Sequence, residues 1–396
     1  MKKILLIFKD RKKITKNHEF WYDKLSLKYD VEMIFLEEYL HLTNLKIIRF
    51  INSKVKSERI DYTIFEGDHV DIIDKTFIDS ITNETLKGLF LGDDNEWHEV
   101  NRINSAGCDF IFTSCPISTL KFNECGIQAL FVPIEANGRI WKNFNLPKDI
   151  DVLFFGREKK IRNKYFDVLE KRNINILKVD PYQEISNTNE KLAKLINRSK
   201  IVLNFSASSK SKRFWTRLNM FDYFYHFKGR ILMTSFCNSL CITEYDPAAS
   251  MIFDEQELPQ FETINECADL VQDFLNDEQK LKNFTKRFHE KGKHYLDENY
   301  IMQIENFLSK NKIRKKNKFH LDFWYVFIHI KQIYRSRFKN NNFITIFKQC
   351  LENFFLYRHY KFLNYLSLNF LSLLFFFRFL PFIPVKIIKN LINKKN

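Results

Sequence analysis

The sequence predicts an α/β protein built from two parallel-sheet domains and a helical, basic, aromatic-rich C-terminal appendage. Over the first 310 of the 396 residues, short apolar runs alternate with helix-like segments, which is the pattern of parallel strands joined by helices. Lys and Arg balance Asp and Glu in that region, whereas the last 86 residues hold 17 Lys and Arg and only 2 Asp and Glu. The formal net charge of +15 therefore belongs to the appendage.

The first domain is predicted over residues 1–145, with about six parallel strands. We expect strands at 4–8, 31–36, 61–67, 88–92, 109–113 and 129–133, with helices between them that include 18–29 and 71–82. The apolar run Ile4 to Phe8 is too short for the core of a signal peptide and suits a buried first strand. Pro147 and the polar stretch 142–149 mark the hinge to the next domain.

The second domain is predicted over residues 146–310 by the same alternation. We expect its strands at 151–155, 174–179, 201–205 and 231–234, with Gly156 after the first strand and Gly229 just before the last. Further on, apolar residues recur at three- and four-residue steps, which indicates two helices that break near Asn276 and Asp277.

The seven cysteines do not form a metal-binding pattern. Cys237 and Cys241 are four residues apart, but no second Cys or His pair with zinc spacing accompanies them. We interpret the cysteines as small buried residues in a reducing cytoplasm, and expect no metal and no bound cofactor.

Several short motifs occur in the order found in one enzyme family. The segments "FFG" (154–156), "SKIVLNFS" (199–206) and "GRILMT" (229–234) resemble the C-terminal half of group-1 glycosyltransferases, and most closely the spore-maturation-type branch. The stretch Leu89 to Asn137 resembles the N-terminal half of the same family. This resemblance covers about residues 1–308. It implies the GT-B fold, in which two Rossmann-like domains face each other across a cleft.

A donor-phosphate site is expected at the carboxyl ends of the second-domain strands, where loops meet helix N-termini. The residues expected to bind the donor phosphates are Gly156, Arg157, Arg162, Ser206, Arg213 and Arg217. Cationic side chains and helix N-termini stabilise a leaving diphosphate without a metal. The alternatives are that the cations form a solvated first helical turn and that the serines only cap the next helix.

A nucleoside site follows from the resemblance. Family members carry an Arg and a Glu in a pattern like R-x-F-E on the helix before a strand, and we place Asn219 and Asp222 at those positions. The carboxylate of this pattern typically holds the ribose hydroxyls. The E-x7-E pair of many retaining relatives is missing, because position 214 is Phe.

The catalytic base is expected in the first domain. Asp93 and Asp94 follow a strand, and we expect burial of one beside the other to raise its pKa. The alternative is that Asp94 caps the next helix. Two rival sets stand at other strand ends: Glu66, Asp68 and His69, and Glu135 with Asn137.

The appendage, residues 311–396, is expected to associate with a membrane. Its apolar run from Phe362 to Phe377 contains polar residues and falls short of the ~20 apolar residues that a spanning helix needs. We favour a helix lying on an anionic membrane surface over a spanning helix and over a helical subdomain packed on the body. Nucleic acid is a poor fit, because the aromatic residues form apolar blocks.

These observations predict a cytoplasmic enzyme peripheral on the inner face of the cell membrane. It would transfer a sugar from a nucleotide-sugar donor to a glycan or lipid-linked acceptor, in the synthesis of surface polysaccharide or glycoconjugate. Two alternatives remain open: a non-catalytic GT-B-like binding or scaffold protein, and a nucleotide-sugar epimerase. The first strand lacks a G-x-G-x-x-G motif, which argues against a dinucleotide site there.

Overall fold

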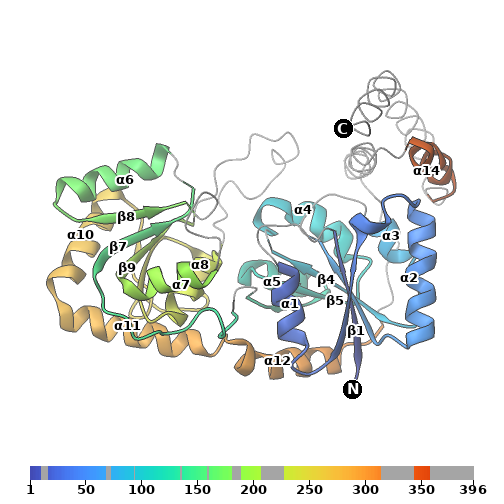
Figure 1. Ribbon diagram of the computed structural model, residues 1–396, viewed down its shortest axis with the longest axis horizontal. Coiled ribbons are helices and arrows are strands. Elements are labelled where there is room, and N and C mark those ends of the chain that lie inside the picture. Colours follow the sequence, from blue (N-terminus) through green and yellow to red (C-terminus); the bar gives the residue numbers. More distant parts are fainter. Residues whose placement is uncertain are drawn as a thin grey trace, which may run out of the picture.

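The protein is described by a computed structural model with two lobes, each built around a parallel β-sheet (Figure 1). The structure describes residues 1–9, 17–67, 73–92, 94–133, 136–157, 160–180, 189–206, 227–313 and 343–356. The first lobe lies toward the N-terminus and the second follows it in the chain. The fold class expected from the sequence is confirmed.

The first lobe contains a six-stranded sheet in the order β2-β1-β3-β4-β5-β6, and every neighbouring pair is parallel. The strands are β1 (Lys3–Phe8), β2 (Asp30–Phe35), β3 (Tyr62–Glu66), β4 (Leu86–Leu91), β5 (Phe110–Thr113) and β6 (Gln128–Phe131). Apolar side chains fill both faces of the sheet and form two separate clusters, because helices cover each face. All six predicted strands are present.

The helices of this lobe connect successive strands. They are α1 (Asn17–Leu25), the 3₁₀ turn η1 (Leu36–Tyr39), α2 (Asn44–Glu58), α3 (Lys75–Asp79), α4 (Asp94–Ser105) and α5 (Pro116–Glu124). In α2, Ile47, Ile48, Ile51 and Val55 are buried at three- and four-residue steps, which places them on the sheet side of the helix. The helix ends at Arg59, whose positive φ of 55° provides a left-handed cap.

The second lobe contains a five-stranded parallel sheet in the order β11-β10-β9-β7-β8. The strands are β7 (Ile150–Phe155), β8 (Ile176–Val179), β9 (Ser199–Asn204), β10 (Leu240–Glu244) and β11 (Gln260–Phe261). The helices are α6 (Lys160–Lys171), α7 (Asn189–Arg198), α8 (Gly229–Phe236), α9 (Pro247–Ser250), α10 (Ile264–Asn276) and α11 (Glu278–Lys293), and α12 (Asp297–Lys310) follows this lobe in the chain. The expected break near Asn276 and Asp277 is confirmed, since Asp277 caps α11.

One predicted strand was wrong. The run at 231–234 forms the interior of α8, and the strand of this unit is β10, which begins at Leu240. Ile231, Leu232 and Thr234 are all buried, so the run shows no polar face. A short apolar run of this kind does not distinguish a buried strand from a buried helix. Asn238, with a φ of 56°, supplies the turn between α8 and β10.

The lobes are joined by a linker and by a returning helix. In the linker, the buried ammonium of Lys148 donates to the carbonyls of Ser199 and Asn238 and to the hydroxyl of Ser239. Beyond the second lobe, α12 crosses back and buries Tyr300 and Ile304 in the core of the first lobe (Figure 1). The two lobes are therefore connected at both ends of the second lobe.

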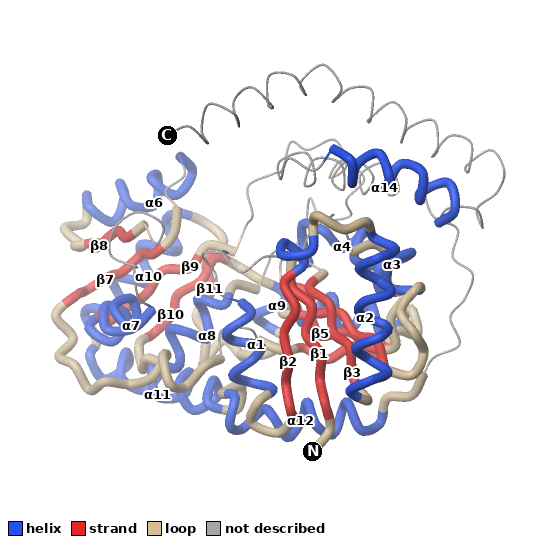
Figure 2. Tube along the Cα trace, turned by 45° about the vertical axis from the view of Figure 1, so that its right-hand side comes forward, coloured by secondary structure: helices blue, strands red, loops and turns tan. Residues whose placement is uncertain are grey.

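A further helix, α14 (Phe343–Leu356), lies in the C-terminal appendage and packs on the first lobe (Figure 2). The position of α14 therefore matches the alternative expectation of a helical segment that packs on the body. The apolar run 362–377 lies outside the described residues. Among the helices in the described part of the chain, none has the length and hydropathy needed to cross a membrane.

Candidate functional site

The candidate site lies at the carboxyl edge of the second sheet. Strands β7, β9 and β10 are parallel neighbours and end at Phe155, Asn204 and Glu244, so their following loops meet at one edge. This edge adjoins the first lobe. Helix α9, just after β10, contacts α5, and the Phe227 ring, just before α8, packs 5.6 Å from the Phe131 ring. The edge thus sits at the junction of the lobes, as a site shared between them requires.

Gly156 and Arg230 meet at this edge. Gly156 directly follows β7 and has a φ of +149°, in the region that favours glycine. A Cβ atom at position 156 would lie 2.7 Å from Nη2 of Arg230. Glycine therefore leaves room for a guanidinium against the backbone at the end of β7, where an anionic ligand would also approach.

Arg230 is held in place from several sides. Its Nη1 donates to Oδ1 of Asn204, 2.9 Å away at the end of β9. Its guanidinium carbon lies 5.4 Å from the ring centre of Phe154 and 5.0 Å from that of Phe155. A guanidinium stacked on aromatic rings keeps its charge but loses rotational freedom. This arrangement pre-organises a cation at the N-terminus of α8, where the helix dipole also favours an anion.

Helix α8 packs closely against α11. The hydroxyl of Ser235 donates to the Phe288 carbonyl at 2.7 Å. Opposite it, a Cβ atom at Gly292 would lie only 1.9 Å from Oγ of Ser235, so the glycine allows the two helices to approach closely. The position of Arg230 therefore depends on packing that reaches through the lobe to α11.

Arg162 also lies near the Phe154 ring. Its guanidinium carbon lies 5.6 Å from the Phe154 ring centre and 5.5 Å from that of Phe205, and its Nη1 donates to the Arg157 carbonyl at 2.9 Å. Burial lowers the pKa of Arg162, while nearby Glu244 acts in the opposite direction. Arg162 thus anchors the loop after β7, and Arg157 itself is exposed.

Ser206 is buried and ties two strand ends together. Its hydroxyl lies 2.9 Å from the Tyr245 carbonyl and 3.2 Å from the Glu244 carbonyl, so it donates to the loop after β10. In this arrangement Ser206 shapes the edge of the sheet. Gly156, Arg157, Arg162 and Ser206 are therefore brought together by the fold, and Arg230 joins them.

The other predicted donor residues, Arg213, Arg217, Asn219 and Asp222, lie outside the described residues, as does Asp93. Of the rival bases, Asp68, His69 and Glu135 are likewise outside them. Glu66 is buried and accepts from the Lys9 backbone at 3.1 Å, and the Asn137 side chain bonds to Asp23 and to the Arg139 backbone.

Asp94 is fully buried at the start of α4. Its two carboxylate oxygens contact Nδ1 of His98 at 3.0 Å and Nδ2 of Asn101 at 2.7 Å. Burial acts against its charged form, but hydrogen bonds from His98, Ser118 and Asn101 outweigh burial, so the pKa of Asp94 is lowered. For Asp94 the expected rise of the pKa does not occur, because these donors stabilise the carboxylate, while Asp93 lies outside the described residues.

Asp246 is a buried carboxylate on the same edge as Arg230. Its Oδ1 accepts from the Ala248 backbone at 2.9 Å at the start of α9. Burial raises the pKa of Asp246 to about 6, against the effect of hydrogen bonds from the Ala248 and Ala249 backbones. The native state therefore binds this proton more tightly than the unfolded chain does.

Asp246→Asn is expected to raise the free energy of unfolding at pH 7.5 by at most about 3 kcal/mol. In the parent protein, the stabilisation of the folded state by protonation of Asp246 is complete below pH ~4 and is lost as the pH rises through about 6. The gain from the substitution should therefore vanish near pH 4. Denaturant unfolding between pH 4 and 8 checks this. Asp167→Asn, on the exposed side of α6, is the control, and an equal gain at both ends of the pH range would contradict the prediction.

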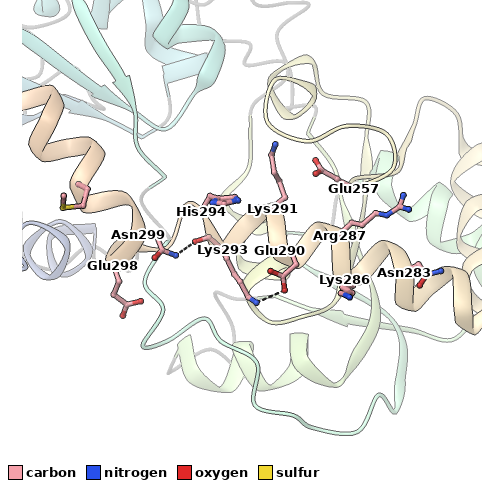
Figure 3. Close-up of a pocket in the computed structure, with 11 residues that line it drawn as sticks. Glu257, Asn283, Lys286, Arg287, Glu290, Lys291, Lys293, His294, Glu298 and Asn299 are labelled. Carbon is pink, nitrogen blue, oxygen red and sulfur yellow. Dashed lines mark hydrogen bonds and ion pairs between the residues drawn. The ribbon is translucent and has the colours of Figure 1, made fainter.

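A separate hollow of about 1130 Å³ lies beside α11 and α12 (Figure 3). Four cations line it with three carboxylates: Lys286, Arg287, Lys291 and Lys293 with Glu257, Glu290 and Glu298. It includes none of the predicted site residues, and its mixed charges do not form a phosphate site. Over the described ranges, no three His, Cys, Asp or Glu side chains gather closely enough to hold a metal ion.

Residues 154–305 match a family model described as glycosyl transferase-like. Over these residues the chain is similar to that family, and we call residues 154–305 the glycosyltransferase-like domain. The matched region holds Gly156, Arg162, Ser206 and Arg230, so the candidate site belongs to the glycosyltransferase-like domain. No curated protein sequence matches the chain.

Solved structures show that the glycosyltransferase-like domain and the lobe before it form a GT-B fold. A glycosyltransferase from Rickettsia africae has a TM-score of 0.53 at 10% identity, covering 78% of this chain and 99% of that one. HepE of Anabaena, solved with UDP-glucose, has a TM-score of 0.53 at 11% identity, covering 78% and 100%. A provisionally assigned UDP-N-acetylglucosamine 2-epimerase from Listeria monocytogenes has a TM-score of 0.50 at 10% identity, covering 81% and 100%. These likenesses concern the fold.

Arg230 was not among the site residues expected from the sequence. It lies on α8, directly before β10, with Met233 three positions later. Sequence reasoning missed Arg230 because it placed a strand where α8 lies. The signal that could have found it is an Arg directly after Gly229.

Proposed function

We propose that this protein is a glycosyltransferase that moves a sugar from a nucleotide-sugar donor to a glycan or lipid-linked acceptor. The observation that carries this proposal is the Arg230 guanidinium, held against Gly156 at the carboxyl edge of the second sheet, within the matched domain. The UDP-glucose in the HepE structure supports a nucleotide sugar as the donor. Glycosyl transfer of this kind corresponds to EC class 2.4.

The proposed chemistry places the donor diphosphate at the N-terminus of α8. As the bond from the sugar to the diphosphate breaks, negative charge grows on the leaving phosphate oxygen. Arg230 would donate to these oxygens, and the N-terminus of α8 would add the positive end of the helix dipole. Because the Asn204 and Phe contacts already hold Arg230, little reorganisation is needed as the charge develops.

The acceptor hydroxyl must lose a proton as it attacks the sugar if the enzyme inverts. We keep Asp93, which follows β4 at the carboxyl edge of the first sheet, as the proposed base. Asp94 is fully buried and bonded to His98 and Asn101, which suits a carboxylate that positions the start of α4. A base role for Asp94 would require these contacts to open.

A second candidate, a non-catalytic GT-B-like binding or scaffold protein, is favoured by one observation. We place the R-x-F-E pattern on α8 with Arg230 at its first position, so that Met233 takes the place of the carboxylate and a contact typical of the donor site would be lost. The GT-B fold also occurs in the provisionally assigned epimerase, so the fold alone does not choose the reaction.

Donor turnover tests these candidates. The purified full chain is incubated with UDP-, GDP- and CMP-linked sugars, with water-soluble glycans or with extracted membrane lipids, and nucleotide release and sugar identity are measured. The proposal expects release of nucleotide together with sugar on an acceptor. Donor binding without release for every acceptor would support the scaffold, and conversion of the donor sugar without transfer would support the epimerase.

We also propose that the reaction takes place at a membrane surface, on the cytoplasmic side, in the synthesis of surface polysaccharide or glycoconjugate. The support is the charge distribution, since the appendage holds 17 Lys and Arg against 2 Asp and Glu while the body is balanced. Juxtaposed cationic and aromatic segments are typical of proteins that bind anionic lipid.

A further inference from the structure

Helix α14 has two faces with different side chains. Thr345, Ile346, Gln349 and Glu352 point toward the first lobe, and both Ile346 and Gln349 are buried there. Because residues three and four apart share one side of a helix, these four positions form a single docking face. The helix is thus fixed on the body rather than loosely attached.

The docking face supplies a cap to another helix. Oε1 of Gln349 accepts from the Asn44 backbone at 2.8 Å, and the Glu352 carboxylate accepts from the Leu45 backbone at 3.3 Å and from the Thr43 hydroxyl at 2.5 Å. Thr43 is the N-cap residue of α2, yet its own side chain caps none of the helix N–H groups. Glu352 and Gln349 therefore satisfy donors at the start of α2, where a negative charge also favours the helix dipole.

The opposite face of α14 is apolar and cationic. Ile344, Phe347 and Leu351 are 67%, 47% and 50% exposed, and their spacing of three and four places them in one stripe, with exposed Lys348 beside it. We call these four residues the outer stripe. Glu352 is the one acidic residue of the sequence between positions 343 and 396, and its carboxylate accepts a hydrogen bond at the N-terminus of α2. The outer stripe therefore carries no carboxylate.

The location of α14 connects it to the reaction. Helix α2 begins after β2, so its N-terminus lies at the carboxyl edge of the first sheet, and α14 sits over that edge (Figure 2). Strand β4, which precedes Asp93, is three places from β2 in the sheet. At about 4.8 Å per strand, the two strand ends are about 14 Å apart. The outer stripe is therefore on the same edge of the sheet as the end of β4.

The flanking sequence favours one occupant for the outer stripe. Residues 311–342 contain 9 Lys and Arg and 1 acidic residue, and residues 357–396 contain 7 and none. An apolar stripe next to a high density of cations is complementary to an anionic bilayer, which offers an apolar interior beneath negative headgroups. An acidic or neutral protein partner would match only one of these two properties.

We infer that the outer stripe of α14 faces an anionic membrane surface and brings the carboxyl edge of the first lobe to it, so that the acceptor is lipid-linked. This inference rests on the proposed function and adds the surface that carries the membrane contact. It assigns two tasks to one helix: Gln349 and Glu352 hold the body, and Ile344, Phe347 and Leu351 contact lipid.

The test uses the full chain and vesicles of phosphatidylcholine with or without phosphatidylglycerol. The double variant Ile344→Ser with Leu351→Ser should lower the partition coefficient onto anionic vesicles at least tenfold. The matched control, Ile161→Ser with Leu120→Ser, removes apolar groups that are 67% and 52% exposed on α6 and α5 and should partition like the parent. Sedimentation equilibrium of each protein reports self-association.

Three outcomes would overturn the inference. The double variant could partition like the parent, which means that another segment of the chain covers the stripe. It could lose self-association instead of lipid binding, which assigns the stripe to a second copy. The parent could fail to bind anionic vesicles at all. Equal transfer to lipid extracts and to water-soluble glycans would also contradict a lipid-linked acceptor. The three vesicle-binding and self-association outcomes do not depend on donor turnover, whose absence would contradict the proposed function instead.

Discussion

Replacing Arg230 with Met is expected to lower the turnover of the nucleotide-sugar donor by about 10²- to 10³-fold in kcat. The guanidinium is held against Gly156 by Asn204 and by the rings of Phe154 and Phe155, so its loss removes a pre-organised donor to the leaving phosphate. Met keeps much of the side-chain volume, which limits damage to the packing of α8. The measurement is initial-rate kinetics with the preferred donor.

Two further variants make this result specific. Arg230→Lys keeps the charge but loses the planar fork, so we expect it to recover only part of the rate. Arg172→Met is the matched control, because Arg172 pairs with Asp269 on the outer surface of the second lobe and should leave kcat unchanged. If Arg230→Met turns over donor at the rate of the Arg172 variant, Arg230 does not act on the phosphate.

Replacing Lys24 with Met is expected to destabilise the protein by about 3–5 kcal/mol. Lys24 is 1% exposed, and its ammonium contacts the Asp297 carboxylate at 2.8 Å and the Pro133 carbonyl at 2.7 Å. Asp297 begins α12, so this pair fastens the returning helix to α1 of the first lobe. Removing the cation leaves a buried carboxylate without its counter-charge.

The pH dependence of this loss has a definite sign. Burial raises the pKa of Asp297, and Lys24 lowers it, so the substitution raises the folded-state pKa further. A raised pKa means that the native state is favoured when the carboxyl is protonated. The destabilisation should therefore be larger at pH 8 than at pH 5.

Thermal and denaturant unfolding measure this loss, and two comparisons control it. Combining Lys24→Met with Asp297→Asn should restore most of the stability, because the unpaired charge is gone. Lys3→Met should cost less than about 1 kcal/mol, because Lys3 and Asp30 form an exposed pair at 3.8 Å. If the Lys24 and Lys3 substitutions cost the same, the buried pair does not brace α12.

The sequence predicted the sheets because buried parallel strands have a local signature. Runs such as Ile4 to Phe8 are apolar at every position, and each is separated from the next by a helix-length polar segment. The same rule failed at 231–234, because a short helix buried on all sides has the same composition as a buried strand. Its neighbours β10 and α11 decide the conformation, and these contacts are not local.

The site was predicted in part for a similar reason. Gly156 and Ser206 stand directly after apolar runs, and Arg162 lies in the first turn of the helix that follows Gly156, so the rule that ligands bind near strand ends pointed to them. Arg230 approaches Gly156 across 74 positions in the sequence, and its stacking on Phe154 depends on the packing of α8. The docking of α14 on α2 brings together residues about 300 positions apart, such as Gln349 and Asn44, and no local sequence pattern predicts this contact.

The most direct measurement is a diffraction experiment on crystals of the full chain soaked with UDP-, GDP- and CMP-linked sugars. The central claim is that the carboxyl edge of the second sheet holds the donor diphosphate. We expect phosphate oxygens within hydrogen-bond distance of the Arg230 guanidinium and next to Gly156, with the sugar directed toward the first lobe. A nucleotide bound in the hollow beside α11 and α12, or phosphates remote from Arg230, would contradict the claim.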